Sequence, residues 1–223
     1  MHITWIGQAG LLIHTDQHTI LIDPYLSDSV GETNPSMHRR VPVDETLFDL
    51  QPDLILCTHS HMDHMDLPTL EHWLRKDRGI LFLGPRTVWE ALKPYGGPHN
   101  YVLFNEGSSW TLGNLRLTAI RAEHSDPYAI GVLLEDDGEV VYVTGDTLYN
   151  RYIFPQLPKH IDRIFLPVNG IGNNMHYADA ARFASDSGAL LAIPVHWGLM
   201  DDLDATDWQY EFKYVPTIYQ PIE

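Results

Sequence analysis

Three histidines and an aspartate fall within six consecutive positions of this chain, directly after an apolar stretch. Residues 53–57 (DLILC) predict a buried strand, and the chain continues as Thr58-His59-Ser60-His61-Met62-Asp63-His64. Because a strand sends alternate side chains to opposite faces, His59 and His61 should point the same way, whereas Asp63 and His64 require a turn. Imidazole and carboxylate groups together suit Zn, Mn or Fe. The spacing therefore favours two adjacent metal ions, a His pair for one and an Asp/His pair for the other.

Two other interpretations of this cluster remain open. One is a histidine-rich surface loop that binds metal adventitiously, and the other is a metal store, since the chain has 13 histidines. Four ligand-type side chains at this spacing, at the end of a buried strand, favour a built site over both.

Composition limits the class of protein. A length of 223 residues fits one sizeable domain, spanning 1–223. The net charge of −16, from 14 basic and 30 acidic residues, disfavours nucleic acid as a partner, because binding its backbone depends on Lys and Arg. The one cysteine, Cys57, excludes an internal disulfide. The first residues lack the pattern of a secretory signal, and no apolar run is long enough to span a membrane. We therefore expect a cytoplasmic protein without a membrane partner; the sequence leaves both a monomer and a homo-oligomer open.

The remaining pattern predicts two groups of strands, each followed by helices. Strands are expected at 3–6, 11–14, 19–22, 53–57, 80–83, 101–104, 109–112, 115–122, 129–135, 140–144, 163–166 and 190–195. Helices are expected at 67–76, 88–93, 149–156 and 177–186, and 204–214 is compatible with another. Residues 26–43 are polar and predict a mobile loop near the site. This order favours an α+β fold in which two sheets pack together with helices outside.

Three further ligand candidates follow predicted strands. His124 follows the strand at 115–122, Asp146 follows 140–144, and His196 follows 190–195. Each is weak evidence alone, because Asp after Gly is usually a turn former and a lone His after a strand is usually packed or exposed. Their joint occurrence after the cluster strengthens the prediction of a metal centre.

The chain resembles the metallo-β-lactamase superfamily of hydrolases, and the resemblance runs from Trp5 to about His196. Residues 58–64 match its H-x-H-x-D-H signature, and His124, Gly145-Asp146 and His196 match its later metal-binding elements. Leu21-Ile22-Asp23 matches its early strand-end aspartate. Within the superfamily, residues 5–10, 84–87, 145–149 and 193–196 are similar to the branch that contains L-ascorbate-6-phosphate lactonase.

The resemblance implies a four-layer αββα sandwich with two divalent metal ions, Zn or Mn with Fe possible, at one edge of the sheets. It implies His59, His61 and His124 as ligands of the first ion, Asp63, His64 and His196 as ligands of the second, and Asp146 as the bridge. A metal-bridging hydroxide would then be the nucleophile, with Asp63 as a proton shuttle. Redox di-iron relatives carry a glutamate where this chain has His61, so hydrolysis is favoured.

Candidates outside the ligand set are less specific. Asp23 is expected to accept a hydrogen bond from a ligand histidine or from backbone near the cluster. A Gly/Asn loop before a predicted helix offers backbone N–H groups to an anion, and ordinary turn and N-cap roles compete with that reading. The substrate-binding candidates are Asn169, Asn173, Asn174 and His176 from this loop, and Tyr149 and Arg151 after the bridging aspartate. Three arginines are candidates for binding a phosphate: Arg39, Arg40 and Arg86.

These observations predict a dinuclear metal-dependent hydrolase acting on the lactone or ester carbonyl of a small, anionic, sugar-derived substrate. A phosphodiesterase acting on a small nucleotide or phospholipid is the nearest alternative, because the same metal pair serves phosphoryl transfer. A non-catalytic metal-binding module is an alternative of another class, but such a module is expected to have lost ligands.

Overall fold

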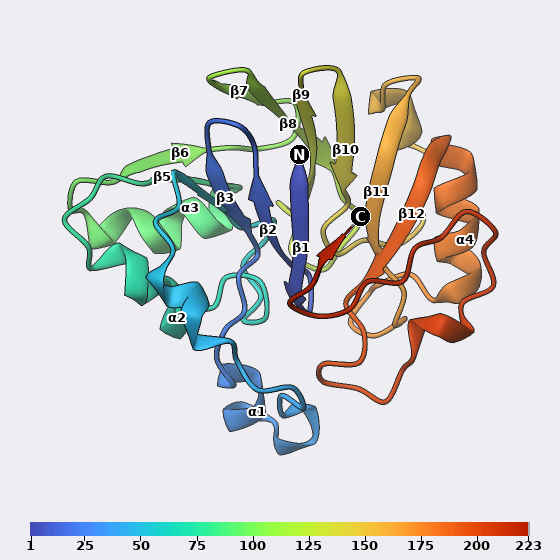
Figure 1. Ribbon diagram of the computed structural model, residues 1–223, viewed down its shortest axis with the longest axis horizontal. Helices are drawn as coiled ribbons and strands as arrows, with labels where there is room; N and C mark the ends of the chain where they lie inside the picture. Colours follow the sequence, from blue (N-terminus) through green and yellow to red (C-terminus); the bar gives the residue numbers. More distant parts are fainter. Residues whose placement is uncertain (223) are drawn as a thin grey trace.

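The strands of this computed structural model, which describes residues 1–222, form two sheets that pack face to face (Figure 1). The first sheet has the order β13-β1-β2-β3-β4-β5-β6. Its strands are β1 (His2–Gly7), β2 (Gly10–His14), β3 (Thr19–Ile22), β4 (Leu54–Leu56), β5 (Leu81–Gly84), β6 (Asn100–Leu103) and β13 (Pro221–Ile222). Neighbours from β13 to β3 are antiparallel, and those from β3 to β6 are parallel.

The second sheet has the order β12-β11-β10-β9-β8-β7. Its strands are β7 (Ser109–Leu112), β8 (Leu115–Arg121), β9 (Ile130–Asp136), β10 (Glu139–Val143), β11 (Ile161–Pro167) and β12 (Ala189–Val195). Neighbours from β7 to β10 are antiparallel, and β10, β11 and β12 are parallel. Asp137 and Gly138, both with positive φ, make the tight turn between β9 and β10.

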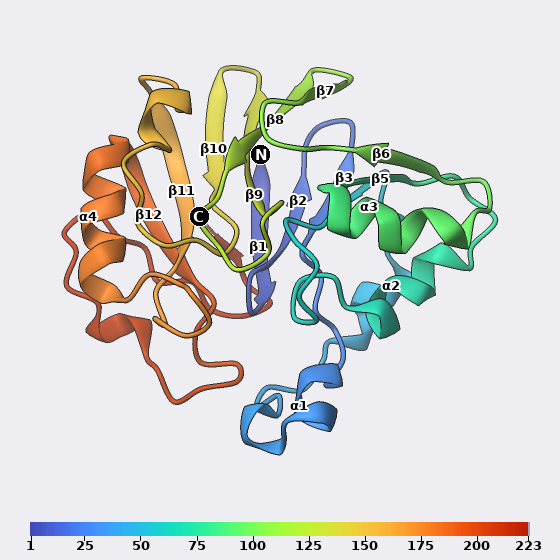
Figure 2. The ribbon, with the colours of Figure 1, turned by 180° about the vertical axis from the view of Figure 1, so that it is seen from behind.

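Helices cover the outer face of each sheet, which gives four layers. Helices α2 (Leu67–Leu74) and α3 (Arg86–Leu92) pack on the first sheet, and α4 (Tyr177–Ser187) packs on the second (Figures 1 and 2). Apolar side chains from both sheets form one core between them. The α+β prediction of two packed sheets with outer helices is confirmed, and the layers are those of an αββα sandwich.

Several strands of both sheets end at the same edge of the sandwich. β1 and β3 run the same way because both are antiparallel to β2, and β4 continues in that direction. In the second sheet, β8 runs with β10, β11 and β12, since β9 is antiparallel to both β8 and β10. The residues that follow these strands can therefore meet at the edge of the sandwich, as ligand sites do in parallel sheets.

Two predicted helices are absent from the structure. Residues 149–156 form a turn and a short 3-10 helix, Phe154–Gln156, because the Asn150 side chain accepts a hydrogen bond from the backbone N–H of Tyr152 and Pro155 lacks a donor. In 204–214 a 3-10 helix, Ala205–Asp207, is followed by extended chain that hydrogen-bonds to Ala192 of β12. Tertiary pairing to the sheet outweighs helix propensity there.

The polar loop 26–43 contains helix α1 (Ser29–Thr33) and a 3-10 helix, Pro35–Met37. It projects at the bottom of the molecule in Figure 1. Its position places it near the edge at which the strand ends meet.

Candidate metal centre

The histidine cluster turns sharply at the end of β4. The backbone N–H groups of His64 and Met65 both donate to the carbonyl of His61, at 3.0 and 2.8 Å. The carbonyl of Thr58 accepts a hydrogen bond from Ile130 N–H at the start of β9, 3.0 Å away. The cluster is thus fixed both by its own turn and by the second sheet, and the predicted turn is present.

The structure brings all seven predicted ligands together in overlapping groups. In each group the candidate donor atoms lie within 4.8 Å of one another: His59, His61 and His124; Asp63, His64 and His196; and His59, His64 and Asp146. Nε2 of His124 lies 3.1 Å from Nδ1 of His61. Nε2 of His196 lies 3.1 Å from Oδ2 of Asp63. The first triad (His59, His61 and His124) and the second triad (Asp63, His64 and His196) therefore lie side by side. Each combines residues that follow different strands.

The Asp146 carboxylate lies between the two triads. Its Oδ2 is 3.9 Å from Nε2 of His124 and 3.3 Å from Nε2 of His196, and its Oδ1 is 3.2 Å from Nε2 of His64. Gly145 precedes it with φ +61°, and a Cβ there would lie 2.7 Å from the carbonyl oxygen of Ile130. Glycine at this position therefore lets the β10 end approach β9 closely enough to present Asp146.

The donor set fits metal ions. Among residues 1–222, Nε2 of His59, Nε2 of His64 and Oδ1 of Asp146 are buried without a hydrogen-bond partner. Buried polar atoms are normally paired, so three such atoms facing one another call for a ligand. Imidazole nitrogens and carboxylate oxygens in this arrangement can hold one or more transition-metal cations.

Burial and neighbouring charges shift the pKa values of the cluster histidines in opposite directions. Burial lowers the pKa of His196, but Asp146 and Asp63 outweigh it and raise the pKa to about 10. Burial likewise opposes protonation of His64, and Asp146, Asp63 and Asp23 together hold its pKa well above the usual range. By contrast, burial followed by the charge of His64 keeps the pKa of His59 well below its usual range. A cation bound by these residues would displace protons from His64 and His196.

Asp23 lies beneath the cluster and is fully buried. One carboxylate oxygen accepts from the backbone N–H of Thr58 at 2.6 Å. The other accepts from the Thr58 hydroxyl at 2.6 Å and lies 2.8 Å from Nδ1 of His64. Both expected contacts, to a cluster histidine and to backbone near the cluster, are present. Such a carboxylate fixes the ring orientation and leaves Nε2 facing a metal.

Two asparagines of the Gly/Asn loop reach the centre. The Asn174 amide donates to Oδ2 of Asp146 at 2.8 Å and accepts from the backbone N–H of Thr147 at 3.1 Å. The Asn169 amide nitrogen lies 3.0 Å from Nδ1 of His196. Asn173 meets the centre through its backbone, because its carbonyl lies 3.3 Å from Nδ1 of His124. The loop thus supports ligand candidates.

Three substrate candidates lie away from the ligand groups. The Tyr149 hydroxyl donates to Asp186 of α4 at 2.7 Å. The Arg151 guanidinium stacks on its neighbour Tyr152. His176 caps α4, with Nδ1 accepting from the backbone N–H of Asp179 at 3.2 Å, and its side chain is 63 % exposed. For His176 the structure shows the ordinary N-cap role that competed with substrate binding.

Gln8 belongs to the centre and was missed from the sequence. It follows β1, is 2 % exposed, and its amide donates to Oδ2 of Asp63 at 2.8 Å. The same amide nitrogen lies 3.0 Å from Nε2 of His196. A glutamine after a Gly carries no metal-ligand signal in the sequence. Gln8 lies at the centre because β1 runs in the same direction as β3, and this shared direction results from the antiparallel pairing of both strands with β2.

A cavity of about 260 Å³ opens beside the second triad. Its lining includes Gln8 and His196 from the centre, Arg40 and Met37 from the 26–43 loop, and Asn169. Arg40 is fixed at its mouth, since its backbone N–H donates to the carbonyl of Leu199 at 2.9 Å and its guanidinium pairs with Asp202. Arg39 is instead used in structural bonds, and Arg86 stacks on Tyr128.

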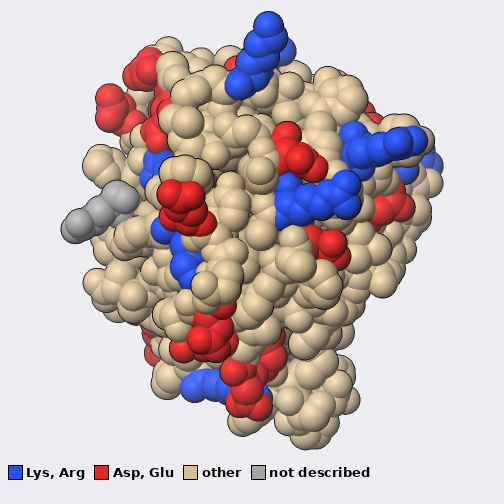
Figure 3. Space-filling model, turned by 90° about the vertical axis from the view of Figure 1, so that its right-hand side faces the viewer, with Lys and Arg blue, Asp and Glu red and all other residues tan. Residues whose placement is uncertain are grey.

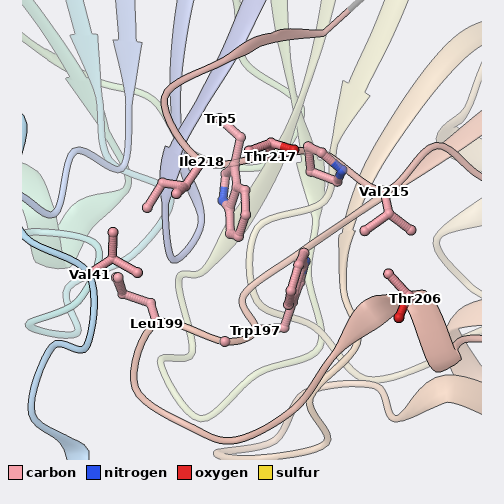
Figure 4. A pocket seen from close by; sticks show the side chains of 10 residues that line it. Trp5, Val41, Trp197, Leu199, Thr206, Val215, Thr217 and Ile218 are labelled. Carbon is pink, nitrogen blue, oxygen red and sulfur yellow. The ribbon is translucent and has the colours of Figure 1, made fainter.

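A second, apolar cavity of about 340 Å³ lies on the other side of the same chain segments. Its lining includes Trp5, Val41, Trp197, Leu199 and Ile218, which face a common hollow in Figure 4. Trp5 and Trp197 stack with ring centroids 5.0 Å apart. This stack supports the centre from behind, because Trp197 follows His196 directly.

Comparison with known proteins decides the family. A model described as the Beta-lactamase superfamily domain matches residues 18–197. The chain belongs to the metallo-β-lactamase superfamily. A UPF0173 protein from Pyrococcus furiosus is 28 % identical, covering 96 % of this chain and 91 % of that protein. A UPF0173 metal-dependent hydrolase from Geobacillus thermodenitrificans is 27 % identical, covering 100 % and 97 %. The chain is thus similar over nearly its whole length to proteins described as metal-dependent hydrolases.

Solved structures of other hydrolases share the fold. A metallo hydrolase from Ignicoccus hospitalis gives a TM-score of 0.74 at 19 % identity, covering 99 % of this chain and 97 % of that chain. An isothiocyanate hydrolase from Delia radicum gut bacteria gives a TM-score of 0.75 at 19 % identity, covering 100 % and 98 %. These matches confirm the metallo-β-lactamase sandwich predicted from the sequence.

Proposed function

We propose that this member of the superfamily is a dinuclear hydrolase that cleaves the ester or lactone carbonyl of a small anionic substrate. The observation that carries the proposal is the position of Asp146, which lies within 3.9 Å of histidines from both triads. A single carboxylate between two three-residue donor groups favours two cations over one. Zn or Mn suits this donor set, and Fe is a further candidate.

Two cations held there would supply an activated water at neutral pH and polarise the carbonyl oxygen. The chain's own residues then arrange the reaction. Asn174 holds Asp146 through a hydrogen bond of 2.8 Å, and Asp23 fixes the ring of His64. Asp63 has a second role as the proton shuttle, because its carboxylate accepts a hydrogen bond from Gln8, which lines the cavity. Burial opposes ionisation of Asp63, but His64 and His196 outweigh it and lower its pKa, which keeps the carboxylate ionised and able to bind a cation.

Arg40 supports an anionic substrate. It lines the cavity beside His196, and its ion-pair partner Asp202 is 95 % exposed. Such an exposed pair contributes little to stability, so a substrate carboxylate or phosphate can replace Asp202 at small cost. This favours the sugar-derived lactone suggested by the lactonase-like resemblance, since the Ser36 hydroxyl also lines the cavity and can bond to a sugar hydroxyl.

A small molecule is the proposed partner, and nucleic acid is not. The chain carries a net charge of −16, and on the α4 side acidic side chains are interspersed with the basic ones (Figure 3). The cytoplasm is the proposed location because Cys57, the one cysteine of the sequence, is free and buried. No helix within residues 1–222 is both long and apolar enough to cross a bilayer.

The test is a metal-reconstituted assay on matched substrates. Protein loaded with Mn or Zn is offered small lactones, carboxylic esters and phosphodiesters, each with and without a second anionic group. We expect two ions per chain and turnover of the anionic lactones or esters. Asp146→Ala should remove the turnover, and Arg40→Leu should raise KM for the anionic members without changing it for the neutral ones. A single bound ion, or turnover that persists in Asp146→Ala, would refute the dinuclear mechanism.

Phosphodiester hydrolysis is the second candidate, and one observation favours it: the two triads and Asp146 provide ligands on both sides of a shared position, as in-line displacement at phosphorus requires. Turnover of the phosphodiesters alone, with two ions bound, would select this chemistry over carbonyl attack.

A further inference from the structure

The Gln8 side chain is held against two members of the same triad. Its amide nitrogen donates to Oδ2 of Asp63 at 2.8 Å and lies 3.0 Å from Nε2 and 3.2 Å from Nδ1 of His196. These two side chains come from different sheets, since Asp63 follows β4 and His196 follows β12. Gln8 therefore links the two halves of the sandwich at the second triad.

The backbone of Gln8 is as constrained as its side chain. Its carbonyl accepts from the backbone N–H of His196 at 2.8 Å and from the Trp5 indole N–H at 2.8 Å. Its φ of +49° lies in the left-handed region, which residues other than glycine rarely adopt. Backbone strain of this kind persists where surrounding structure determines it, and it concentrates at functional sites.

The stacked indoles of Trp5 and Trp197 (Figure 4) hold the Gln8 backbone in this conformation. Trp5 bonds to the Gln8 carbonyl, and Trp197 follows His196, so the stack ties both sides of the contact together. Gly7 has φ +101°, and a Cβ there would lie 2.9 Å from Ile218. The turn that presents Gln8 to the centre is therefore built by close packing around residues 5–8.

We propose that Gln8 is a positioning residue of the metal centre, whose amide N–H orients the Asp63 carboxylate beside His196 so that the two can hold one cation. This inference rests on the proposed two-ion centre and adds Gln8 to the residues that position its ligands. Outer hydrogen-bond partners of metal ligands act in this way, and their loss typically weakens metal binding about 10–100-fold.

The chemistry of an amide suits this position. An amide N–H donates a hydrogen bond at every pH and carries no charge, so it does not compete with a cation as Lys or Arg would. It also leaves the carboxylate of Asp63 ionised, as a metal ligand must be. The side chain of leucine has nearly the same volume and no donor, which makes Gln8→Leu the direct test.

The experiment measures ion binding rather than turnover. Metal-free wild-type protein, Gln8→Leu and Gln8→Gly are titrated with Zn²⁺ by calorimetry, and with Co²⁺ by its visible absorption. Glycine accepts φ +49° without strain, so Gln8→Gly removes the amide while favouring the native backbone. Gln156→Leu is the matched control, because the amide of this half-buried glutamine bonds to Glu106 and to the backbone of Arg121 and Tyr152 and to none of the predicted ligands.

We expect both Gln8 variants to bind one ion about 10–100-fold more weakly and to bind the other as wild type does, with an altered Co²⁺ spectrum. Gln156→Leu should match wild type. Wild-type affinity for both ions in either Gln8 variant overturns the proposal, and so does an equal loss for both ions. If Gln8→Leu does not fold, Gln8→Gly decides. A wild-type protein that binds fewer than two ions instead overturns the two-ion function itself, whatever the variants do.

Discussion

Replacing Asp23 tests whether a buried carboxylate, rather than the ligands alone, holds the metal centre together. Asp23 accepts three hydrogen bonds of 2.6 to 2.8 Å from Thr58 and His64, and all three residues are fully buried. Asparagine has the same shape and tolerates the φ of +45° at this position. Asp23→Asn therefore changes the charge and one acceptor while keeping the backbone.

The size of the effect follows from these contacts. A hydrogen bond to a charged group contributes about 1.5–3 kcal/mol, against about 0.5–1.5 for a neutral pair. Asparagine keeps an oxygen at only one of the two carboxylate positions, so at least one of the three bonds is lost and the others become neutral, which lowers the free energy of unfolding by about 4 kcal/mol. Asp23→Ala leaves three buried donors without acceptors and costs more, about 5 kcal/mol, which is a large part of the ~5–15 kcal/mol that stabilises a typical domain.

Urea unfolding of metal-free and metal-loaded protein measures both consequences. Asp23→Asn should unfold at lower urea in both states and bind metal about 10–100-fold more weakly, because the His64 ring loses its anchor. Asp137→Asn is the control, since Asp137 also has positive φ, at +47°, but lies exposed in the β9–β10 turn. If Asp23→Asn and Asp137→Asn behave alike in stability and metal affinity, the role assigned to Asp23 is wrong.

Three further predictions concern the same edge of the sandwich. In metal-free protein, nearby carboxylates outweigh the burial of His196 and raise its folded-state pKa to about 10. Protonated His196 therefore stabilises the fold fully below the unfolded-state pKa of about 6.5, and this contribution is lost as the pH rises through the folded-state pKa. The urea midpoint should accordingly fall between about pH 7 and 10. A flat midpoint over that range contradicts this. Asp126 accepts hydrogen bonds from the backbone and hydroxyl of Ser60, at 3.1 and 2.8 Å, and Asp126→Ala should lower the free energy of unfolding by about 2–4 kcal/mol, with Ser60→Ala costing less in the same calorimetric scan. Gly145→Ala would place a Cβ 2.7 Å from the Ile130 carbonyl at a φ of +61°, and it should reduce both melting temperature and bound metal; an unchanged metal content would show that this close approach is not required.

The sequence by itself predicts the cluster of ligand candidates, because each candidate follows a strand and carries a metal-binding side chain, and the structure brings these side chains together. Residues 58–64 encode their function locally, since an apolar strand and a turn are enough to gather three histidines and an aspartate. His124, Asp146 and His196 were found by the same rule, and strand patterns also gave the two packed sheets. Their close approach depends on the strands running in a common direction and on the short distance between β9 and Gly145.

The tertiary structure decided what local pattern does not encode. Gln8 joins the centre only because β1 pairs with β2 and the backbone is held at φ +49° by bonds to His196 and Trp5. Conversely, Tyr149 follows the bridging aspartate in sequence but turns away to bond Asp186 on the outer helix. A side chain's distance from the centre is set by which elements pack across the sandwich, and that information lies in contacts between residues far apart in the chain rather than in its local spacing.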